Sequence, residues 1–386
     1  MGTTEPIIIL GTGLAGYSTA RELRKLDGAL PLLLITADDG RYYSKPMLSN
    51  GYAQGKDADS LAINSAAQMA DQLKARVVTH ARVEAIDTGA RQVLAGGTRY
   101  GYAKLVLALG ADPIRLPLRG DAADRVLSVN DLGDYARFRA AAAGAQRVAI
   151  LGAGLIGCEF ANDLIGAGIA VDVIDIAPQP LGRLMPAHAA DDLRAALEAL
   201  GVRWHFGTGV ERVDAEGAAL RLTLTNGQTL DSDVVLSAIG LKPRTALAAA
   251  AGLTVNRGIV TDAQLATGAP DVYALGDCAE VAGLSLPFVM PIMHASRALA
   301  RTLAGTPTAV SYPAMPVVVK TPARATVVAP PPAGRAGQWR EEVIPDGVRA
   351  LYESPEGRLL GFALTGAATK EKLALAKQLP AWLPAG

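Results

Sequence analysis

Residues 6–16 read Pro-Ile-Ile-Ile-Leu-Gly-Thr-Gly-Leu-Ala-Gly, and residues 147–157 repeat the pattern as Arg-Val-Ala-Ile-Leu-Gly-Ala-Gly-Leu-Ile-Gly. In both stretches an apolar run typical of a buried parallel strand leads into a glycine-rich turn and then a helical pattern. The first glycine of such a motif permits a tight turn, the second lets the backbone approach a pyrophosphate, and the third allows close helix–strand packing. The sequence therefore predicts two dinucleotide sites, on the turns formed by Gly11, Thr12, Gly13, Leu14, Ala15 and Gly16 and by Gly152, Gly154, Leu155, Ile156 and Gly157.

The bulk composition indicates a globular protein of more than one domain. A chain of 386 residues is too long for a single compact core, so we expect two or three domains. Lysine and arginine together number 37, as do aspartate and glutamate, so no net field attracts nucleic acid or a membrane surface. The amino terminus lacks the basic segment of a signal peptide, and no apolar run reaches the roughly 18 residues of a membrane span.

The pattern of apolar segments repeats along the chain. A strand predicted over 105–113 ends in glycine and proline, and residues 234–240 form a second apolar strand that runs into glycine. We interpret the two halves as an internal repeat of a βαβ-type domain, each with a Rossmann-like fold. The predicted class is therefore α/β, with two dinucleotide-binding domains.

The remaining segments suggest how the domains divide. We assign a strand at 272–277, ending in Gly-Asp, and a helix at 291–303 to the first domain, which makes that domain discontinuous. After about Ser311 the sequence changes to short strands and a helix at 370–378, which indicates a small α+β domain. We expect one dinucleotide-binding domain at 1–112 and 241–310, the other at 113–240, and the α+β domain at 311–386.

Acidic residues near the predicted strand ends are candidates to bind the adenosine ribose. Asp175 lies about 20 residues past the second set of glycines and is followed by no basic residue, which favours NADH over NADPH. The alternative is that Asp175 only caps a strand. In the first unit Thr36 and Ala37 occupy the equivalent position and Asp38 follows, so backbone groups or Asp38 serve there. Gly276-Asp277 at a later strand end fits a second cofactor contact better than a simple turn.

The order of motifs resembles that of the flavoprotein pyridine-nucleotide reductases, which have the glutathione-reductase-like fold and bind two dinucleotides. Within them, the segments 38–49, 315–322 and 363–368 are similar to the rubredoxin–NAD⁺ reductases. The resemblance covers nearly the whole chain. It implies FAD in the first domain, NADH in the second, and rubredoxin, a small and typically acidic iron–sulfur protein, as acceptor. It also implies a role in supplying a hydroxylase, such as one that acts on alkanes.

The same resemblance assigns the catalytic positions. Lys45 and Pro46 fall beside the flavin ring, where Lys45 hydrogen-bonds near N5 or pairs with Glu159; the alternative is an exposed loop lysine. Glu159 is expected near the contact between flavin and nicotinamide, although a carboxylate in the first turn of a helix is also stabilising by itself. Lys320 is expected near the flavin from the third domain. Four further cofactor contacts are implied: Val83, Gly110, Gly240 and Val289.

The cysteines separate this chain from the disulfide reductases. Cys158 and Cys278 are far apart in sequence, so we expect them to be reduced packing residues in a cytoplasmic protein, and electrons to leave to a separate carrier. The four histidines lack metal-ligand spacing, and His294 alone is a candidate for a flavin role. We expect no metal site and a monomer or weak dimer.

Three alternatives remain open from the sequence: a ferredoxin reductase of an oxygenase system, an NADH oxidase or peroxidase, and a non-catalytic dinucleotide sensor. The rubredoxin hypothesis requires a locally basic docking face. The candidates for it are Arg41, Lys45, Lys320 and Arg324.

Overall fold

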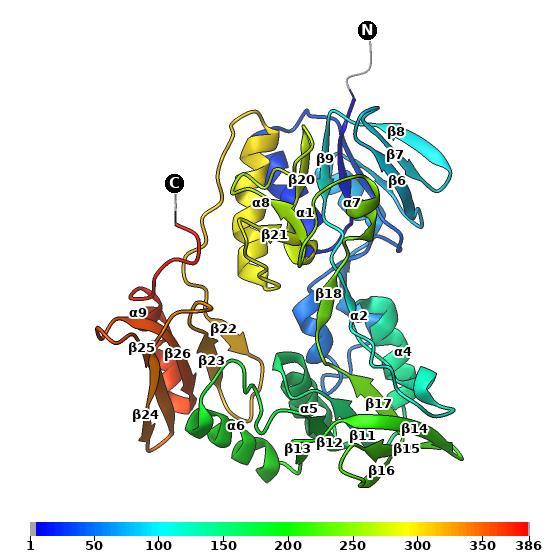
Figure 1. Ribbon diagram of the computed structural model, residues 1–386. Coiled ribbons are helices and arrows are strands. Elements are labelled where there is room, and N and C mark those ends of the chain that lie inside the picture. The colour runs from blue at the N-terminus through cyan, green and yellow to red at the C-terminus, as the bar shows by residue number, and fades with distance from the viewer. Residues whose placement is uncertain (1–4, 385–386) are drawn as a thin grey trace.

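The computed structural model describes residues 5–384, and its first layer is a five-stranded parallel sheet (Figure 1). The strand order is β20-β9-β1-β2-β5, and the helices α1 and α8 pack against each other beside the sheet. Strand β1 is buried throughout because its four residues are all apolar and have sheet neighbours on both sides. The bounds are β1 (Ile7–Leu10), α1 (Leu14–Leu26), β2 (Leu32–Ile35), β5 (Arg76–Val78), β9 (Lys104–Leu107), β20 (Val272–Ala274) and α8 (Val289–Leu303).

The second sheet has the same plan with four parallel strands, in the order β13-β12-β11-β17. Both repeats contain a strand, a helix that begins at the glycine-rich turn, and a second parallel strand. The bounds are α4 (Leu132–Ala142), β11 (Arg147–Leu151), α5 (Leu155–Gly166), β12 (Ala170–Asp175), α6 (Ala187–Ala199), β13 (Arg203–Phe206) and β17 (Val234–Ser237). The predicted α/β class with two Rossmann-like units is therefore confirmed.

Each repeat also inserts a three-stranded antiparallel sheet, before β9 in the first unit and before β17 in the second. In the first unit these strands are β6 (Val83–Asp87), β7 (Gln92–Ala95) and β8 (Thr98–Gly101). In the second they are β14 (Val210–Glu216), β15 (Ala219–Leu224) and β16 (Thr229–Ser232). The internal repeat thus extends beyond the glycine motifs to the whole βαβ-plus-meander unit.

A two-stranded antiparallel ribbon connects the two units. Strand β10 (Ala111–Pro113) takes the chain out of the first unit, and β18 (Leu241–Pro243) brings it back. The prediction of one strand over 105–113 is wrong, because the chain breaks between β9 and β10. Gly110, at φ +71°, turns the backbone out of the sheet there.

The third layer is a five-stranded antiparallel sheet of order β22-β23-β26-β25-β24. Its strands are β22 (Val317–Val319), β23 (Thr326–Ala329), β24 (Gln338–Ile344), β25 (Gly347–Glu353) and β26 (Leu359–Thr365). The helix predicted over 370–378 is shorter than expected: a 3₁₀ turn at Gly366–Glu371 leads into α9 (Lys372–Ala376). The helix predicted from Pro291 instead begins two residues earlier, at Val289.

One segment of the first unit packs into the core of the second. It follows strand β3 (Tyr42–Tyr43) and contains a 3₁₀ turn, Lys45–Ser49, and helix α2 (Ala58–Leu61), followed by β4 (Ala62–Asn64) and α3 (Ala66–Leu73). Leu48, Ala58 and Leu61 are buried in the same apolar cluster as Phe138 and Phe160 of the second unit. A division of the chain by sequence order alone does not capture this excursion.

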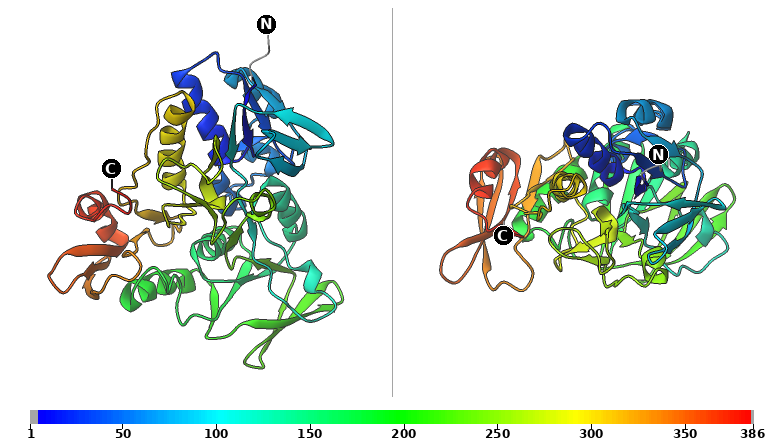
Figure 2. Two further views of the ribbon diagram at one scale, coloured as in Figure 1. Left: turned by 45° about the horizontal axis from the view of Figure 1, so that its top comes forward. Right: turned by 90° about the horizontal axis from the view of Figure 1, so that it is seen from above.

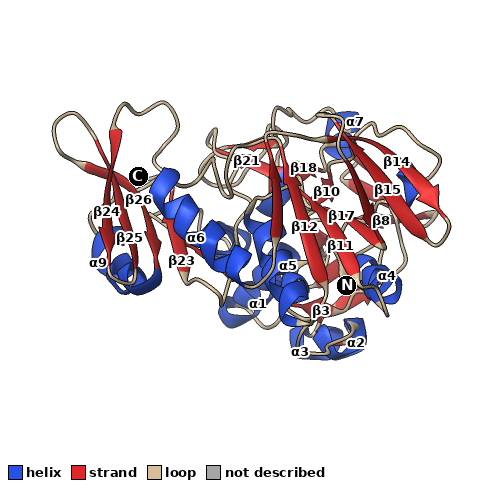
Figure 3. Cartoon of the chain, turned by 90° about the horizontal axis from the view of Figure 1, so that it is seen from below, coloured by secondary structure: helices blue, strands red, loops and turns tan. Residues whose placement is uncertain are grey.

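The third sheet shares a core with the second unit, through helix α6 (Figure 3). Arg324, in the turn between β22 and β23, pairs with Asp192 of α6 through two nitrogens at 2.6 and 2.8 Å. The Glu341 carboxylate of β24 accepts a hydrogen bond from the Ala189 backbone N–H in the first turn of α6, at 3.1 Å. Within residues 5–384, no helix is long and apolar enough to cross a membrane.

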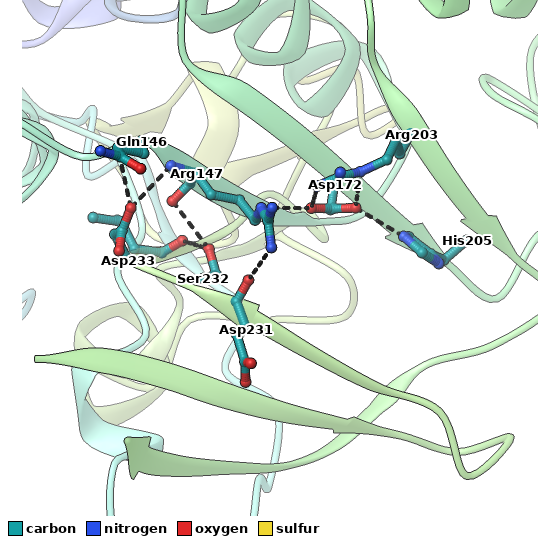
Figure 4. A network of polar contacts seen from close by, with 9 residues as sticks. Gln146, Arg147, Asp172, Arg203, His205, Asp231, Ser232 and Asp233 are labelled. Carbon is teal, nitrogen blue, oxygen red and sulfur yellow. Dashed lines mark hydrogen bonds and ion pairs between the residues drawn. The ribbon is translucent and has the colours of Figure 1, made fainter. Parts of the chain in front are cut away.

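A buried carboxylate ties three strands of the second sheet together (Figure 4). Asp172 of β12 is 2 % exposed and accepts two hydrogen bonds from Arg203 of β13, at 2.8 and 2.6 Å. Its Oδ1 lies 3.0 Å from His205 Nε2, and Arg147 of β11 approaches within 3.8 Å. Burial alone would raise the pKa of Asp172, but the hydrogen bonds from Arg203 and His205 hold it below its usual value.

We expect Asp172→Asn to lower the free energy of unfolding at pH 7 by about 1–3 kcal/mol, because it removes the charge that Arg203 pairs with. Since the pKa of Asp172 is depressed in the folded protein, its contribution is full at neutral pH and is lost as the pH falls through the folded pKa. Urea unfolding at pH 7 and pH 3 measures both effects. Glu22→Gln, which removes one partner of an exposed pair with Lys25, is the control and should cost less than about 0.5 kcal/mol. Equal losses for the two variants would contradict the assignment.

Candidate functional site

The first glycine-rich turn lies where neighbouring parallel strands of the first sheet end, the edge at which such sheets bind ligands. Gly11, Thr12 and Gly13 follow β1, and Leu14, Ala15 and Gly16 begin α1. Thr36, Ala37 and Asp38 follow β2, Gly110 lies just beyond β9, and Gly276 and Asp277 follow β20 in a 3₁₀ turn. The topology therefore brings together candidates that are up to 266 positions apart in the sequence, from Gly11 to Asp277.

The second turn occupies the same place in the second sheet. Gly152 and Gly154 follow β11, while Leu155, Ile156 and Gly157 form the first turn of α5. Asp175 ends β12, and its Oδ2 accepts a hydrogen bond from the Ala153 backbone N–H at 2.5 Å. Gly240 lies between β17 and β18. The carboxylate of Asp175 is thus held directly against the glycine-rich turn.

The glycines of each turn have different steric reasons to be glycine. A Cβ on Gly11 would lie 2.3 Å from the Ala108 carbonyl oxygen, and one on Gly157 would lie 1.9 Å from that of Gly152. In contrast, a Cβ on Gly13 or Gly154 would meet no described atom within 4 Å, and both residues have ordinary negative φ. Packing within the protein explains the outer glycines only. The middle ones fit a ligand that approaches the backbone closely, as a dinucleotide pyrophosphate does.

Asp38 is fixed beside the first turn. Its Oδ1 accepts from Thr36 Oγ1 at 2.7 Å and from the Gly40 backbone N–H at 3.0 Å, and Thr12 Oγ1 lies 3.4 Å away. Val83 begins β6, two residues beyond Ala81, whose backbone N–H donates to the Thr36 carbonyl at 2.9 Å. Asp38 and Val83 therefore lie near the end of β2, where an adenosine ribose is expected.

Lys45 and Pro46 begin the 3₁₀ turn Lys45–Ser49. Lys45 Nζ lies 3.6 Å from Asp277 Oδ2. The predicted pairing of Lys45 with Glu159 is wrong, because Glu159 is occupied by a different lysine. Lys45 instead pairs with Asp277, which is itself a candidate residue of the first site.

Glu159 joins three distant parts of the chain. It lies on α5 and is 3 % exposed. Lys320, just after β22, binds Glu159 twice: its Nζ pairs with Oε2, and its backbone N–H donates to Oε1 at 3.0 Å. Ser49 Oγ, from the first unit, donates to Oε2 at 2.6 Å and accepts from Lys320 Nζ at 3.3 Å.

Ser49 was not predicted as a site residue. It is 2 % exposed and lies in the same 3₁₀ turn as Lys45 and Pro46, so it links that turn to the Glu159–Lys320 pair. A lone serine in a loop gives no sequence signal. Only its position four residues after the candidate Lys45 could have drawn attention to it.

Helix α8 begins at Val289, the last of the predicted flavin contacts to be placed. The positive end of the helix dipole lies at this amino terminus. His294 lies in the next turn. Burial and the nearby Arg297 lower the pKa of His294, so the imidazole is neutral at pH 7. His294 forms no described contact with the other site candidates.

Both cysteines are fully buried and free. Burial raises the pKa of Cys278 to about 11 and also raises the pKa of Cys158. Their sulfurs donate to backbone carbonyls, so both are packing residues and protonated at neutral pH. Within the described residues, no group of three His, Cys, Asp or Glu is arranged to hold a metal.

The four basic residues proposed for docking do not form a free positive face. Arg41 pairs with Asp39 and Asp59, Lys45 with Asp277, Lys320 with Glu159, and Arg324 with Asp192 and Asp346. Each charge is compensated by a carboxylate of the chain itself. That part of the sequence interpretation is not supported.

We expect Gly154→Ala to raise the KM for NADH by about tenfold, because the new methyl group meets only the approaching ligand. Its cost to folding should stay below about 1 kcal/mol, since the Cβ has no protein neighbour. Gly157→Ala is the matched control: its Cβ collides with the Gly152 carbonyl, so it should lose about 1–3 kcal/mol of stability. Unchanged NADH kinetics in a folded Gly154→Ala protein would contradict the assignment.

We expect the double variant Asp175→Ala, Ile176→Arg to lower the preference for NADH over NADPH by about a hundredfold, since it removes the ribose acceptor and adds a phosphate donor. Steady-state kinetics with both coenzymes measures this ratio. Asp214→Ala, in the antiparallel meander of the same unit, is the control and should leave the ratio unchanged. A double variant that still prefers NADH as strongly as the parent would refute this role of Asp175.

Comparison with known proteins agrees with this geometry. A family profile described as "Pyridine nucleotide-disulphide oxidoreductase" matches residues 5–302, and one described as "Rubredoxin binding C-terminal domain" matches residues 309–379. The chain is 51 % identical over 98 % of its length to all of the rubredoxin-NAD(+) reductase of Alcanivorax borkumensis. It is 48 % identical, over 98 % of its length and 99 % of the relative, to that of Acinetobacter baylyi.

A solved structure extends the likeness to three dimensions. The ferredoxin reductase for the CYP199A2 system from Rhodopseudomonas palustris superposes with a TM-score of 0.87 at 26 % identity, covering 97 % of this chain and 95 % of that one. Together with the profile match over more than three quarters of the sequence, these similarities establish that the chain belongs to the pyridine nucleotide-disulphide oxidoreductase family.

Proposed function

We propose that this protein is an NADH-dependent flavoprotein reductase that delivers electrons to rubredoxin. FAD binds at the first glycine-rich turn and NADH at the second. The observation that carries the proposal is the Ser49–Glu159–Lys320 cluster, which joins the first unit, the second unit and the third sheet at one buried point. The two dinucleotide cradles are thereby held in a fixed relation.

The residues of the chain bind and orient, while the cofactor supplies the redox chemistry. When bound, FAD would supply the redox chemistry that links a two-electron hydride donor to a one-electron acceptor. The backbone N–H groups of the two turns hold the pyrophosphates, and Asp38 and Asp175 accept from the ribose hydroxyls. Glu159 and Lys320 form a partly buried ion pair near the proposed flavin position, and Lys45 and Asp277 form a second, more exposed pair there.

Two features support a separate protein as the electron acceptor: the lack of a cysteine pair and the sequence of the third sheet. The protein has no second cysteine near Cys158 to receive electrons as a disulfide, so they must leave the chain. Residues 309–379 match the rubredoxin-binding domain profile, and the two relatives most similar among those described above are named rubredoxin-NAD(+) reductases. We include in the proposal a cytoplasmic location, a monomer or weak dimer, and supply of electrons to a hydroxylase.

The domain roles belong to the same proposal. Residues 1–112 and 241–310 form the FAD-binding part and 113–240 the NADH-binding part, with the excursion around Lys45–Ser49 in contact with both. Residues 311–386 form the part that meets the partner. The clusters of buried apolar residues support a separate first unit. The cluster of the second unit also includes the excursion and residues of the third sheet, such as Val328 and Ala363.

A ferredoxin reductase is the second candidate, because the solved ferredoxin reductase described above shares the fold over nearly the whole chain. This second candidate function differs from the first in the protein that accepts the electrons, and it uses the same proposed cofactor sites. The experiment below therefore compares acceptors.

The test is reduction of purified rubredoxin by NADH and the FAD-loaded protein under anaerobic conditions. We expect NADH to bleach the visible flavin band, and rubredoxin to be reduced at least about tenfold faster than a [2Fe–2S] ferredoxin at equal concentration. A flavin band that NADH does not bleach would eliminate the reductase function. Faster reduction of ferredoxin would favour the second candidate, and rapid oxygen consumption without a carrier would favour an oxidase.

A further inference from the structure

Helix α8 has an unusual surface for a helix of its length. It comprises fifteen residues with two arginines and neither aspartate nor glutamate. Nine of its residues are buried against the first unit. Of the other six residues, four form a stripe at helical spacing: Met290, Arg297 and Arg301, which are exposed, and His294, which is half-buried.

The charge of this stripe is uncompensated. Arg297 and Arg301 are both exposed, and neither forms an ion pair with a carboxylate anywhere in the described chain. Surface helices usually intersperse both signs of charge, which limits their field. The neutral His294 adds no charge, so the two arginines and the half-exposed Met290, at 46 %, define the chemistry of the stripe. An apolar residue beside arginines is typical of a protein-binding surface.

The position of the stripe relates it to electron transfer. It starts next to Val289, a residue proposed to contact the flavin, and at 1.5 Å per residue Arg297 and Arg301 lie about 12 and about 18 Å further along the helix. Figures 1 and 2 show that α8 is the element of the first unit nearest to the third sheet. The amino-terminal end of α8 is the end nearer to that sheet, so the Met290 end of the stripe adjoins it.

We propose that the stripe Met290–His294–Arg297–Arg301 of α8 is the electrostatic docking surface for rubredoxin, with the third sheet as its second wall. This inference rests on the proposed function and replaces the four paired basic residues expected from the sequence. An acidic partner is attracted to unpaired arginines, and its association is faster at low salt. The match of residues 309–379 to a rubredoxin-binding domain supplies the adjoining surface.

The test is charge reversal at the stripe in the FAD-loaded full-length protein. We expect Arg297→Glu, Arg301→Glu to lower kcat/KM for rubredoxin by at least about tenfold at low ionic strength, and to flatten its dependence on salt. The rate at which NADH bleaches the flavin should not change, which also shows that the variant is folded. Arg297→Lys, Arg301→Lys keeps the charge and should retain most of the rate.

A matched control separates docking from total charge. Arg99 is exposed on β8, away from α8, and Arg99→Glu combined with Arg82→Glu changes the net charge by the same amount. This control should reduce rubredoxin as the parent does. The docking inference is overturned if the α8 variant reduces rubredoxin at the parental rate, or if both double variants slow it equally. Failure of the parent protein to reduce rubredoxin would instead overturn the proposed function.

Discussion

A carboxylate removed from water must have its charge compensated, and Glu159 meets this requirement with groups from two other parts of the chain. Ser49 and Lys320 are 110 and 161 positions away in sequence, respectively, yet both contact the same Oε2 atom. A buried ion pair that loses one member leaves the other uncompensated, at a cost of about 3–5 kcal/mol. The packing of the first unit, the second unit and the third sheet is therefore mutually dependent at this one oxygen.

The connections between the parts are unequal in strength. The third sheet shares an apolar cluster with the second unit, and Arg324 and Glu341 fasten it to Asp192 and Ala189 in the amino-terminal half of α6. The first and second units are joined chiefly by the ribbon of β10 with β18 and by the excursion that contains Ser49. The second unit and the third sheet thus pack around one shared core, and the Glu159 cluster is a polar contact between them and the first unit.

Much of the fold was predictable because its signals are local. The glycine turns and the apolar strands of both repeats follow from residues within a few positions of one another, and the structure confirms the repeat. The contacts made by Lys45 were not predictable, since whether it pairs with Glu159 or Asp277 depends on how three segments pack. The same reason explains Ser49, whose role appears only in the folded chain. The prediction of a basic docking face is not supported, because a sequence does not show which basic side chains form ion pairs in the folded protein. Arg324, for example, pairs with Asp192.

The burial of both thiols has a practical consequence. Cys158 and Cys278 are the only cysteines of the chain, and neither exposes its sulfur or ionises at neutral pH. A reduced flavin in air generates hydrogen peroxide, which attacks thiolates and leaves protonated, inaccessible sulfur intact. Burial therefore protects both thiols from the peroxide that a reduced flavin produces in air.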